Sequence, residues 1–465
     1  MAKNARAAAK KDAEAVQRCI LPACGAQFEI REALLVCSRC GGPLEVELSS
    51  DSLAHHTNLK ALWASRRGSL DPRDRSGVWR FRELLPFEES APVVTLGEGN
   101  TPLYDAPRCA EYTGLRSLRL KHQGCNPTGS FKDTGMTTAV TQAVLLGART
   151  VACASTGNTA ASLAAYAARA GLQCAILVPR GQITAAKLAQ SMDYSAVICE
   201  IAGNFDDCMR LIQELAGDPS MYIANSINPF RIEGQKTVAF ELLEQCGWKV
   251  PGHVVVPGGN MGNSSALGKG FSELMDLGLI ERLPKLSIVQ AEGAAPVAKL
   301  FAEMNRTGAA NASEISDTLE PVQNPKTLAT AIKIGSPVSW RKALRAVLES
   351  RGQIITVSEE EIADAKAMIG RDGIGCEPAS ATTVAGIKKL AAAGHIRRDE
   401  DVVAVLTGHI LKDPDYAGNY HRGMLSLGAG EKKPAEHRIA GEFQNPPEQV
   451  AATKKAILES LKRRR

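Results

Sequence analysis

Several features that would place a protein in a broad class at once are missing from this sequence. The 465 residues contain no apolar run that approaches the roughly 20 residues of a membrane-spanning helix, so no membrane association is expected. The basic residues at the N-terminus are followed by no apolar segment, which argues against a secretory signal and makes the cytoplasm the expected compartment. The Ala, Lys and Arg content there leaves an organelle-targeting peptide open, although Asp12 and Glu14 weigh against it.

Excess charge is scarce outside the two ends of the chain. The formal net charge is +5, but residues 1–18 hold five Lys and Arg against two acids and residues 431–465 hold nine against five, which leaves the remainder near −2. A body without a basic excess is not expected to bind nucleic acid. The closing Lys462-Arg-Arg-Arg465 is expected to end a solvated helix, with a weak contact to nucleic acid or an acidic partner as the alternative.

The common nucleotide-binding fingerprints are absent as well. The glycine-rich stretch after the apolar run Val254–Pro257 does not have the Gly-x-Gly-x-x-Gly spacing of a dinucleotide site. Gly268-Lys269-Gly270 fails the Walker A pattern, which requires Ser or Thr after the lysine. A strand that enters a helix through bare glycines nevertheless presents free backbone N–H groups at the positive end of the helix dipole, so this stretch predicts a phosphate cradle.

Of the 12 cysteines, four lie within the first forty residues as the pairs Cys19/Cys24 and Cys37/Cys40. Two cysteine pairs on short glycine-containing turns, about a dozen residues apart, match a zinc ribbon, whose four thiolates bind Zn²⁺ tetrahedrally. Free or redox-active thiols are the alternative. Few basic residues accompany the pairs, which favours a structural role over nucleic-acid binding. The other cysteines, such as Cys153, lie in apolar segments and suit a reducing compartment.

The chain is long enough for two or three packed domains, and its middle alternates strand-like and helix-like blocks. Apolar strands joined by helices predict an α/β body in which parallel strands are covered on both faces. The predicted strands are Thr150–Ser155, Cys174–Pro179, Ala196–Ile201, Tyr222–Asn225, His253–Pro257, Leu286–Ala291, Ile354–Ser358 and Val402–Thr407. The predicted parts are a basic tail (1–18), a zinc-ribbon-like knuckle (19–50), a polar helix-and-loop connector (51–94), the body (95–430, with a smaller subdomain at about 136–235) and a C-terminal tail and helix (431–465).

Lys132 follows a rigid Asn-Pro-Thr-Gly turn and precedes a helix that is predicted to begin at Met136, with Ser130 or Asp133 as its cap. Backbone of this kind holds an amine in one position, which is what a Schiff-base lysine requires. An ordinary surface lysine is the alternative for this residue taken alone.

The segment Ser130-Phe-Lys-Asp133 resembles the lysine segment of the pyridoxal-phosphate (PLP) enzymes of fold type II, the tryptophan-synthase-β group. The longer stretch from Lys121 to Met136 resembles the threonine synthase family, and Gly97–Leu103 is similar to the segment that opens the catalytic body there. The resemblance extends from about Thr95 to Asp413. It implies a fold-type-II enzyme with two parallel-sheet subdomains, PLP bound to a catalytic Lys132, and a homodimer.

The same resemblance assigns roles to residues at the predicted strand ends. Ser155, Thr156 and Thr159 would bind the substrate and Asn158 would lie beside the PLP hydroxyl, although this segment read alone is equally a helix cap. Asn225, Ser226 and Arg231 would bind the substrate's phosphate. Thr407 would hydrogen-bond the pyridine nitrogen. The PLP phosphate would lie in the cradle made by Gly258, Gly259, Asn260, Met261, Gly262 and Asn263, and Glu377–Ser380 resembles a loop near the cofactor.

The implied reaction converts O-phospho-L-homoserine and water to L-threonine and phosphate. A cysteate-synthase-like enzyme acting on O-phosphoserine and sulfite remains an alternative, as does a zinc-ribbon binding protein on a degenerate enzyme scaffold. A dehydratase fits less well because it has no use for the second phosphate site at Arg231. Three residues depart from the family pattern: Ile410 replaces a glycine, and Gln123 and Thr134 replace residues that are more often acidic and basic.

Overall fold

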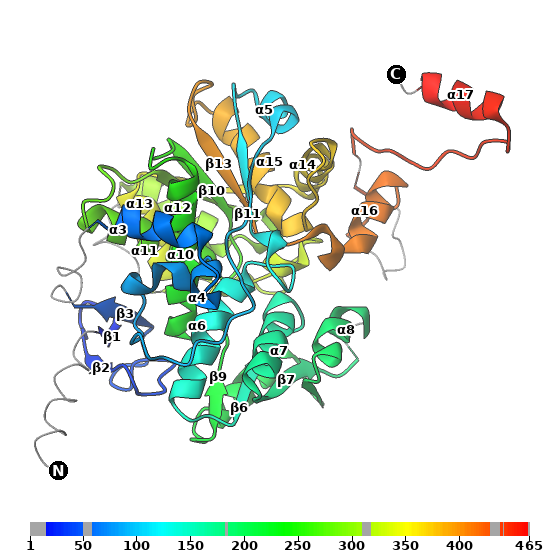
Figure 1. Ribbon diagram of the computed structural model, residues 1–465. Helices are drawn as coiled ribbons and strands as arrows, with labels where there is room; N and C mark the ends of the chain where they lie inside the picture. Colours follow the sequence, from blue (N-terminus) through cyan, green and yellow to red (C-terminus); the bar gives the residue numbers. More distant parts are fainter. Residues whose placement is uncertain are drawn as a thin grey trace, which may run out of the picture.

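The computed structural model describes residues 15–49, 58–181, 185–308, 318–427, 438–439 and 441–463, so the predicted basic tail lies outside it up to residue 14. Two parallel sheets with their helices form the body, and a small antiparallel sheet lies beside it near the N-terminus (Figure 1). Helix α17 (Lys454–Arg463) lies within the range predicted as a C-terminal tail and helix and extends away from the body. Among the described helices, none combines the length and the apolar character needed to cross a bilayer.

The larger sheet has its most buried strands at its centre. β10 (His253–Pro257) and β13 (Val402–Leu406) bury every residue and pair in parallel. Val254, Val256, Val403 and Val405 face one hydrophobic core, while Val255, Ala404 and Leu406 face another. This alternation is the strand period of two applied to a sheet that is covered on both sides. The strand order is β12 (Ile354–Val357), β11 (Lys285–Ala291), β10, β13, β5 (Arg119–His122) and β4 (Leu103–Asp105), and only the β4–β5 pair is antiparallel.

Helices cover both faces of this sheet. Helices α5 (Pro107–Thr113), α14 (Glu359–Arg371) and α15 (Pro378–Ala392) contribute to the core on one face. Helices α10 (Pro229–Gln245) and α11 (Gly262–Asp276) contribute to the core on the other. The predicted α/β body is therefore confirmed in its larger half.

The smaller sheet is entirely parallel, in the order β8 (Val197–Ile201), β7 (Gln173–Pro179), β6 (Thr150–Ala154) and β9 (Met221–Ile223). Helices α6 (Lys132–Leu145) and α7 (Asn158–Ala170) pack on one face, and α9 (Phe205–Leu215) packs on the other. All eight predicted strands are present within one or two residues at each end. The strands β4 and β5 and those of the N-terminal sheet were not predicted.

The cysteine-rich region is a three-stranded antiparallel sheet in the order β2 (Gln27–Glu29), β1 (Ala15–Cys19), β3 (Leu44–Leu48). It starts at Ala15, inside the range predicted as a basic tail. The sheet is attached to the body: the Lys342 ammonium donates to the Leu44 carbonyl at 2.6 Å, and the Gln142 amide donates to the Ile30 carbonyl at 2.9 Å. The predicted knuckle is thus fixed to two helices of the body, α6 and α13 (Trp340–Glu349).

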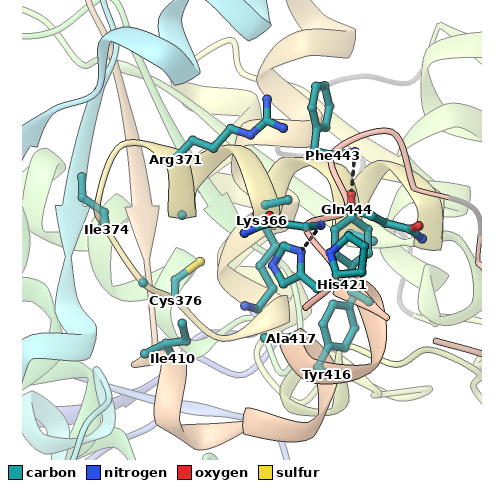
Figure 2. A pocket seen from close by; sticks show the side chains of 17 residues that line it. Lys366, Arg371, Ile374, Cys376, Ile410, Tyr416, Ala417, His421, Phe443 and Gln444 are labelled. Atoms are coloured by element: carbon teal, nitrogen blue, oxygen red, sulfur yellow. Dashed lines mark hydrogen bonds between the residues drawn. The ribbon is translucent and has the colours of Figure 1, made fainter. Parts of the chain in front are cut away.

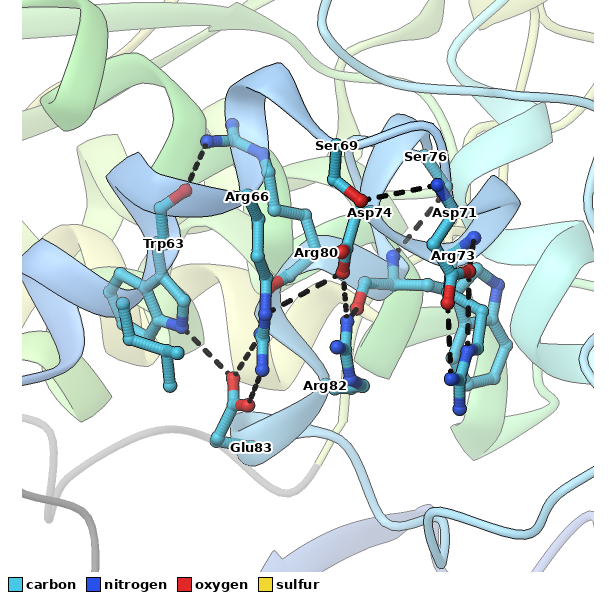
Figure 3. A network of polar contacts seen from close by, with 12 residues as sticks. Trp63, Arg66, Ser69, Asp71, Arg73, Asp74, Ser76, Arg80, Arg82 and Glu83 are labelled. Carbon is cyan, nitrogen blue, oxygen red and sulfur yellow. Dashed lines mark hydrogen bonds and ion pairs between the residues drawn. The ribbon is translucent and has the colours of Figure 1, made fainter.

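The predicted connector is a packed part of the body. Trp63 of α3 (Leu59–Ser65) is fully buried, and its ring centroid lies 5.0 Å from that of Phe81. Around it Arg66 forms ion pairs with Glu83 and, at 3.5 Å, with Asp74 (Figure 3). This segment is therefore helical and loop-rich as predicted, but its aromatic side chains belong to the core of the body.

Helices α6 and α10 cross so closely that only glycine fits at the contact. A Cβ at Gly234 would lie 1.8 Å from the Thr134 carbonyl oxygen, and one at Gly135 would lie 2.9 Å from the Arg231 carbonyl oxygen. The Thr138 hydroxyl also donates across the crossing to the Phe230 carbonyl at 2.8 Å. The first turns of the two helices, which hold Lys132 and Arg231, are consequently brought together.

Gly234→Ala is therefore expected to lower stability by about 3 kcal/mol or more, because the new methyl group would overlap backbone that cannot move without separating the helices. The urea midpoint of unfolding measures the loss. Gly370→Ala on α14 is the matched control, since a Cβ there meets no atom within 4 Å and helix propensity predicts a gain of about 1 kcal/mol. A Gly234→Ala midpoint equal to that of wild type would contradict the close crossing.

Candidate active site

The polar residues singled out in the sequence lie where parallel strands end. Ser155 follows β6, Gly258 opens the loop after β10, Thr407 follows β13, and Asn225 lies two residues after the end of β9. Ligands of open α/β sheets bind beyond these carboxyl ends. Direct contacts join the two subdomains there: the Asn158 amide donates to Glu377 Oε2 at 2.9 Å, and the Asn260 amide donates to the Ser226 hydroxyl at 3.4 Å.

Lys132 is the first residue of α6, so the prediction that this helix begins at Met136 is wrong. The reason is the side chain of Asp133, which accepts hydrogen bonds from the Thr128 backbone N–H at 2.7 Å, the Thr128 hydroxyl at 2.6 Å and the Ser162 hydroxyl at 2.5 Å. These bonds tie the turn to the helix and let the helix extend back to the lysine. The Lys132 ammonium lies 4.0 Å from the Phe131 ring centroid.

The surroundings of Lys132 favour its neutral form. Burial and, to a smaller extent, the positive charge of Arg231 lower the pKa of its amine to about 7, whereas Glu377 acts in the opposite direction. A free amine near neutral pH is both a nucleophile and a base. Burial also raises the pKa of the Glu377 carboxyl, although its hydrogen bonds to Asn158 and Thr407 oppose that shift.

Glu377 joins Asn158 and Thr407, the residues that were predicted to contact the hydroxyl and the nitrogen of the cofactor ring. It accepts from Asn158 through one oxygen and from the Thr407 hydroxyl, at 3.2 Å, through the other. The Ser380 hydroxyl accepts from the Thr407 backbone N–H at 2.8 Å and so fixes the end of β13. The sequence marked this segment as near the cofactor but gave Glu377 no role, because its partners lie 219 and 30 residues away.

The glycine-rich loop is shaped by close packing. A Cβ at Gly258 would lie 2.6 Å from a methyl carbon of Ile288, and Met261 adopts a left-handed conformation (φ 64°) that turns the chain into α11. Inside this turn the Asn263 side-chain oxygen and the Ser264 hydroxyl are buried without a hydrogen-bond partner. Buried polar atoms are rarely left unpaired, so these two, with the free N–H groups of the helix start, indicate a polar ligand. Ser264 was not among the predicted site residues.

Arg231 is 2 % exposed, and its guanidinium forms no ion pair with any described residue. One nitrogen donates to the Ala224 carbonyl at 3.2 Å, while Nε has no partner. Burial lowers the pKa of this guanidinium to about 10, which shows how poorly its charge is compensated. A buried unpaired cation is costly unless an anion binds beside it, so Arg231 indicates an anion site next to Lys132.

The other predicted substrate contacts differ in how free their polar groups are. The side-chain amide of Asn225 accepts from the Ala154 backbone N–H and donates to the Ala154 carbonyl, both at 3.1 Å. Asn225 therefore holds the ends of β6 and β9 together. The Ser155 hydroxyl accepts weakly from the Gly157 N–H at 3.3 Å. Thr156 is partly buried, and Thr159 is 8 % exposed at the start of α7.

The four N-terminal cysteines come together in the ribbon. The sulfur atoms of Cys19, Cys24, Cys37 and Cys40 all lie within 4.8 Å of one another. The Cys19–Cys40 and Cys24–Cys37 distances are 3.5 and 3.7 Å, and no disulfide joins them. Tetrahedral Zn²⁺ with Zn–S bonds of about 2.3 Å would separate its sulfur ligands by roughly 3.8 Å, so the cluster fits such an ion.

A lysine with a lowered pKa, a rigid glycine cradle with unpaired polar atoms, and a hydroxyl at the end of β13 are the parts of a pyridoxal-phosphate-dependent enzyme. The sequence profile of the family described as "Pyridoxal-phosphate dependent enzyme" matches residues 94–408. The residues present fit the cofactor, because the amine, the cradle and Thr407 lie in one site with polar atoms left unpaired there.

Curated relatives and solved structures agree with this class. The threonine synthase of Methanocaldococcus jannaschii is 45% identical over 403 residues, which cover 86% of this chain and 94% of the relative. That of Mycobacterium leprae is 47% identical over 339 residues, covering 72% and 88%. The diaminopropionate ammonia lyase of Escherichia coli is similar in fold (TM-score 0.57, 15% identity, covering 80% of this chain and 92% of that chain). The chain therefore belongs to the pyridoxal-phosphate-dependent enzymes and, among them, to the threonine synthase family.

The lowered pKa of Lys132 predicts how fast the cofactor-free protein captures added pyridoxal phosphate. Only the neutral amine reacts, so the rate should rise with pH and level off above about 7. With a surface lysine the rate would continue to rise up to the ordinary pKa near 10.4. Glu377→Gln should move this midpoint down, because the carboxylate normally raises the Lys132 pKa. Stopped-flow absorbance across pH measures both. A wild-type midpoint above 9 would contradict the burial effect.

Proposed function

We propose that this protein is a threonine synthase, which converts O-phospho-L-homoserine and water to L-threonine and phosphate. The observation that carries the proposal is Arg231, a buried guanidinium that pairs with no carboxylate of the described residues and whose charge acts on Lys132. A substrate with a phosphate at one end and an amino acid at the other would bring an anion to Arg231 and its α-carbon to the lysine. The relatives named threonine synthase support the same assignment.

The predicted substrate contacts fit a phosphate at the ends of β6 and β9. Arg231 offers its unpaired Nε, and Ser155, Thr156 and Thr159 offer hydroxyls at the start of α7. Ser226 adds a hydroxyl that accepts a long hydrogen bond from Asn260. Asn225 would have to give up a bond to Ala154 before it touched the substrate, so its contribution is the position of the two strand ends.

Bound pyridoxal phosphate supplies the electron sink that makes protons on the substrate's α- and β-carbons acidic. Lys132 would hold the cofactor, remove those protons and return them, which its lowered pKa allows near neutral pH. Thr407 would place a neutral hydroxyl at the ring nitrogen, which favours an unprotonated ring, and Asn158 would hold the ring's own hydroxyl. The loop Gly258–Asn263 would hold the cofactor phosphate.

The proposal is tested by measuring inorganic phosphate and L-threonine in the same tube after O-phospho-L-homoserine is added to the PLP-loaded protein. Equal amounts of both are expected. Phosphate without threonine would overturn the proposal in favour of elimination to a keto acid. If neither product forms from protein that shows the PLP absorption band, the same assay with O-phosphoserine and sulfite tests the cysteate-synthase-like alternative.

We further propose that the cluster Cys19, Cys24, Cys37 and Cys40 holds one structural Zn²⁺. Thiolate–zinc bonds form only in the folded ribbon, so their free energy stabilises the fold. Cys37→Ser is expected to lose the metal and lower the thermal midpoint, whereas Cys125→Ser, an exposed cysteine outside the ribbon, should retain both. Metal content is measured by colorimetric titration after a mercurial reagent displaces the ion. Wild-type protein that contains no zinc after growth with zinc would refute this assignment.

The cytoplasmic location and the homodimer stay predictions. All 12 cysteines are free thiols, which supports a reducing compartment. Sedimentation of the PLP-loaded protein tests the dimer, and a monomer at micromolar concentration would contradict it.

A further inference from the structure

A cavity of about 600 Å³ lies apart from the proposed substrate contacts, on the far side of the segment that leads into Glu377. One wall is a face of α14 with Ala363, Lys366, Ala367 and Gly370 at helical spacing. The opposite wall is α16 (Pro414–His421) with the segment 443–446 from near the C-terminus (Figure 2). Segments far apart in the sequence thus enclose one chamber that the proposed reaction does not use.

The charged side chains that line this cavity, the buried Lys366 and the exposed Arg371, are basic and form no ion pair with the described residues. Lys366 is 8 % exposed, and its ammonium forms no hydrogen bond or ion pair with the described residues; the Tyr416 ring centroid lies 5.9 Å away. Arg371 stacks on Phe443, with 4.7 Å to the ring centroid, and also forms no ion pair in the described part of the chain. The Tyr416 hydroxyl is buried without a partner. A cation that is more than nine-tenths buried and unpaired indicates a missing anion.

A third nitrogen donor faces the same space. His421 Nδ1 accepts from the Asn445 backbone N–H at 3.1 Å, so the proton of the neutral ring lies on Nε2. Burial, together with the charges of Lys366 and Arg371, lowers the pKa of His421 and keeps the ring neutral at pH 7. The nearby Asp364 forms no ion pair with Lys366 or Arg371; its Oδ1 accepts from the Tyr420 hydroxyl at 2.6 Å and from the Glu442 N–H at 3.0 Å.

We propose that this cavity binds a small organic anion, with its carboxylate or phosphate group between Lys366 and Arg371 and a ring or apolar body against the remaining walls. Apolar and aromatic side chains on those walls include Ile374, Ile410 and Phe443. A cavity of 600 Å³ is within the range of small-molecule sites. The proposal rests on the cavity and its charges, and it does not depend on the threonine synthase activity.

The cavity adjoins the cofactor site through the residues next to Glu377, so a ligand in the cavity is expected to affect the cofactor. Cys376 lines the cavity, pairs with His409 in a β-bridge and precedes Glu377. Ile410, which also lines the cavity, packs on Gly375: a Cβ there would lie 2.9 Å from that of Ile410. Binding should therefore change the absorbance of bound pyridoxal phosphate through Glu377.

The test uses 8-anilinonaphthalene-1-sulfonate, an aromatic anion whose fluorescence rises on binding, with the PLP-loaded full-length protein. Saturable binding to the wild type is expected. The double variant Lys366→Gln/Arg371→Gln should bind at least about tenfold more weakly, because two charged contacts are lost. Lys388→Gln, which removes an exposed lysine over the Tyr112 ring outside the cavity, should bind as the wild type does. Equal affinity in the double variant would overturn the proposal.

Gly370→Leu is a second variant that controls for misfolding of the double variant. A Cβ at Gly370 meets nothing within 4 Å, and leucine favours helix, so the fold should be kept while the side chain fills the cavity mouth. This variant should have the thermal midpoint and the PLP absorption band of the wild type, but it should not bind the dye. Retained dye binding in Gly370→Leu, or displacement of the dye by O-phospho-L-homoserine with no effect of the Lys366 and Arg371 changes, would place the dye in the active site and refute the proposal.

Discussion

Lys132→Ala is expected to abolish threonine formation, with turnover reduced by more than about 10³-fold, because the variant has no amine to hold the cofactor or to carry protons. The structure argues against another amine taking over the role of Lys132. Among the described lysines, Lys412 also lies near Glu377, but its ammonium is held by Gln190 at 2.6 Å. Coupled measurement of phosphate and threonine gives the rate.

Two further measurements separate lost chemistry from lost folding in this variant. The visible absorption of the lysine-bound cofactor should disappear, while the thermal midpoint stays near that of the wild type, because Asp133, Thr128 and Ser162 still tie the turn together. Lys333→Ala removes an exposed lysine and is the matched control. Appreciable threonine formation by Lys132→Ala would contradict the role of this residue in any mechanism that uses pyridoxal phosphate.

The body of the fold was predictable because its determinants are local. Fully apolar runs such as β10 and β13 bound by glycines and polar turns gave eight parallel strands, and strand ends gave the positions of the glycine-rich loop and Thr407. What escaped prediction depends on distant partners. Helix α6 begins four residues early because Asp133 bonds Ser162, 29 residues away. The aromatic residues of the connector became core because Phe240, far along the chain, packs against Trp63.

The candidate site shows the same division. The type of each residue and its place at a strand end were visible in the sequence, so Lys132, Asn158 and Arg231 could be predicted as site residues. Whether a charge is compensated was not visible, since this depends on which side chains the fold brings close. Arg231 could have met a carboxylate, as the buried Lys236 meets Glu233 at 2.6 Å one turn later in the same helix. Its lack of such a partner is a property of the folded chain.

That lack of a partner predicts an opposition between stability and activity at Arg231. Arg231→Met should stabilise the ligand-free protein, because the unfolded chain holds this proton more strongly than the folded one, where burial lowers the pKa to about 10. The gain should be present at every pH below that value. The same variant should lose about 10²-fold in kcat/KM for O-phospho-L-homoserine, as expected when a charged contact worth about 1.5–3 kcal/mol is removed.

Thermal unfolding in phosphate-free buffer and steady-state kinetics measure the two effects. Arg231→Lys is the matched control: it keeps a buried charge, so it should lose activity without becoming more stable. Removing the positive charge should also raise the pKa of Lys132, which moves the pH midpoint of cofactor capture upward in Arg231→Met and leaves it nearly unchanged in Arg231→Lys. A destabilised Arg231→Met variant with normal kinetics would mean that the arginine has a structural function. A more stable Arg231→Met variant with reduced kcat/KM would mean that the fold accepts a buried charge because the substrate's phosphate compensates it during each turnover.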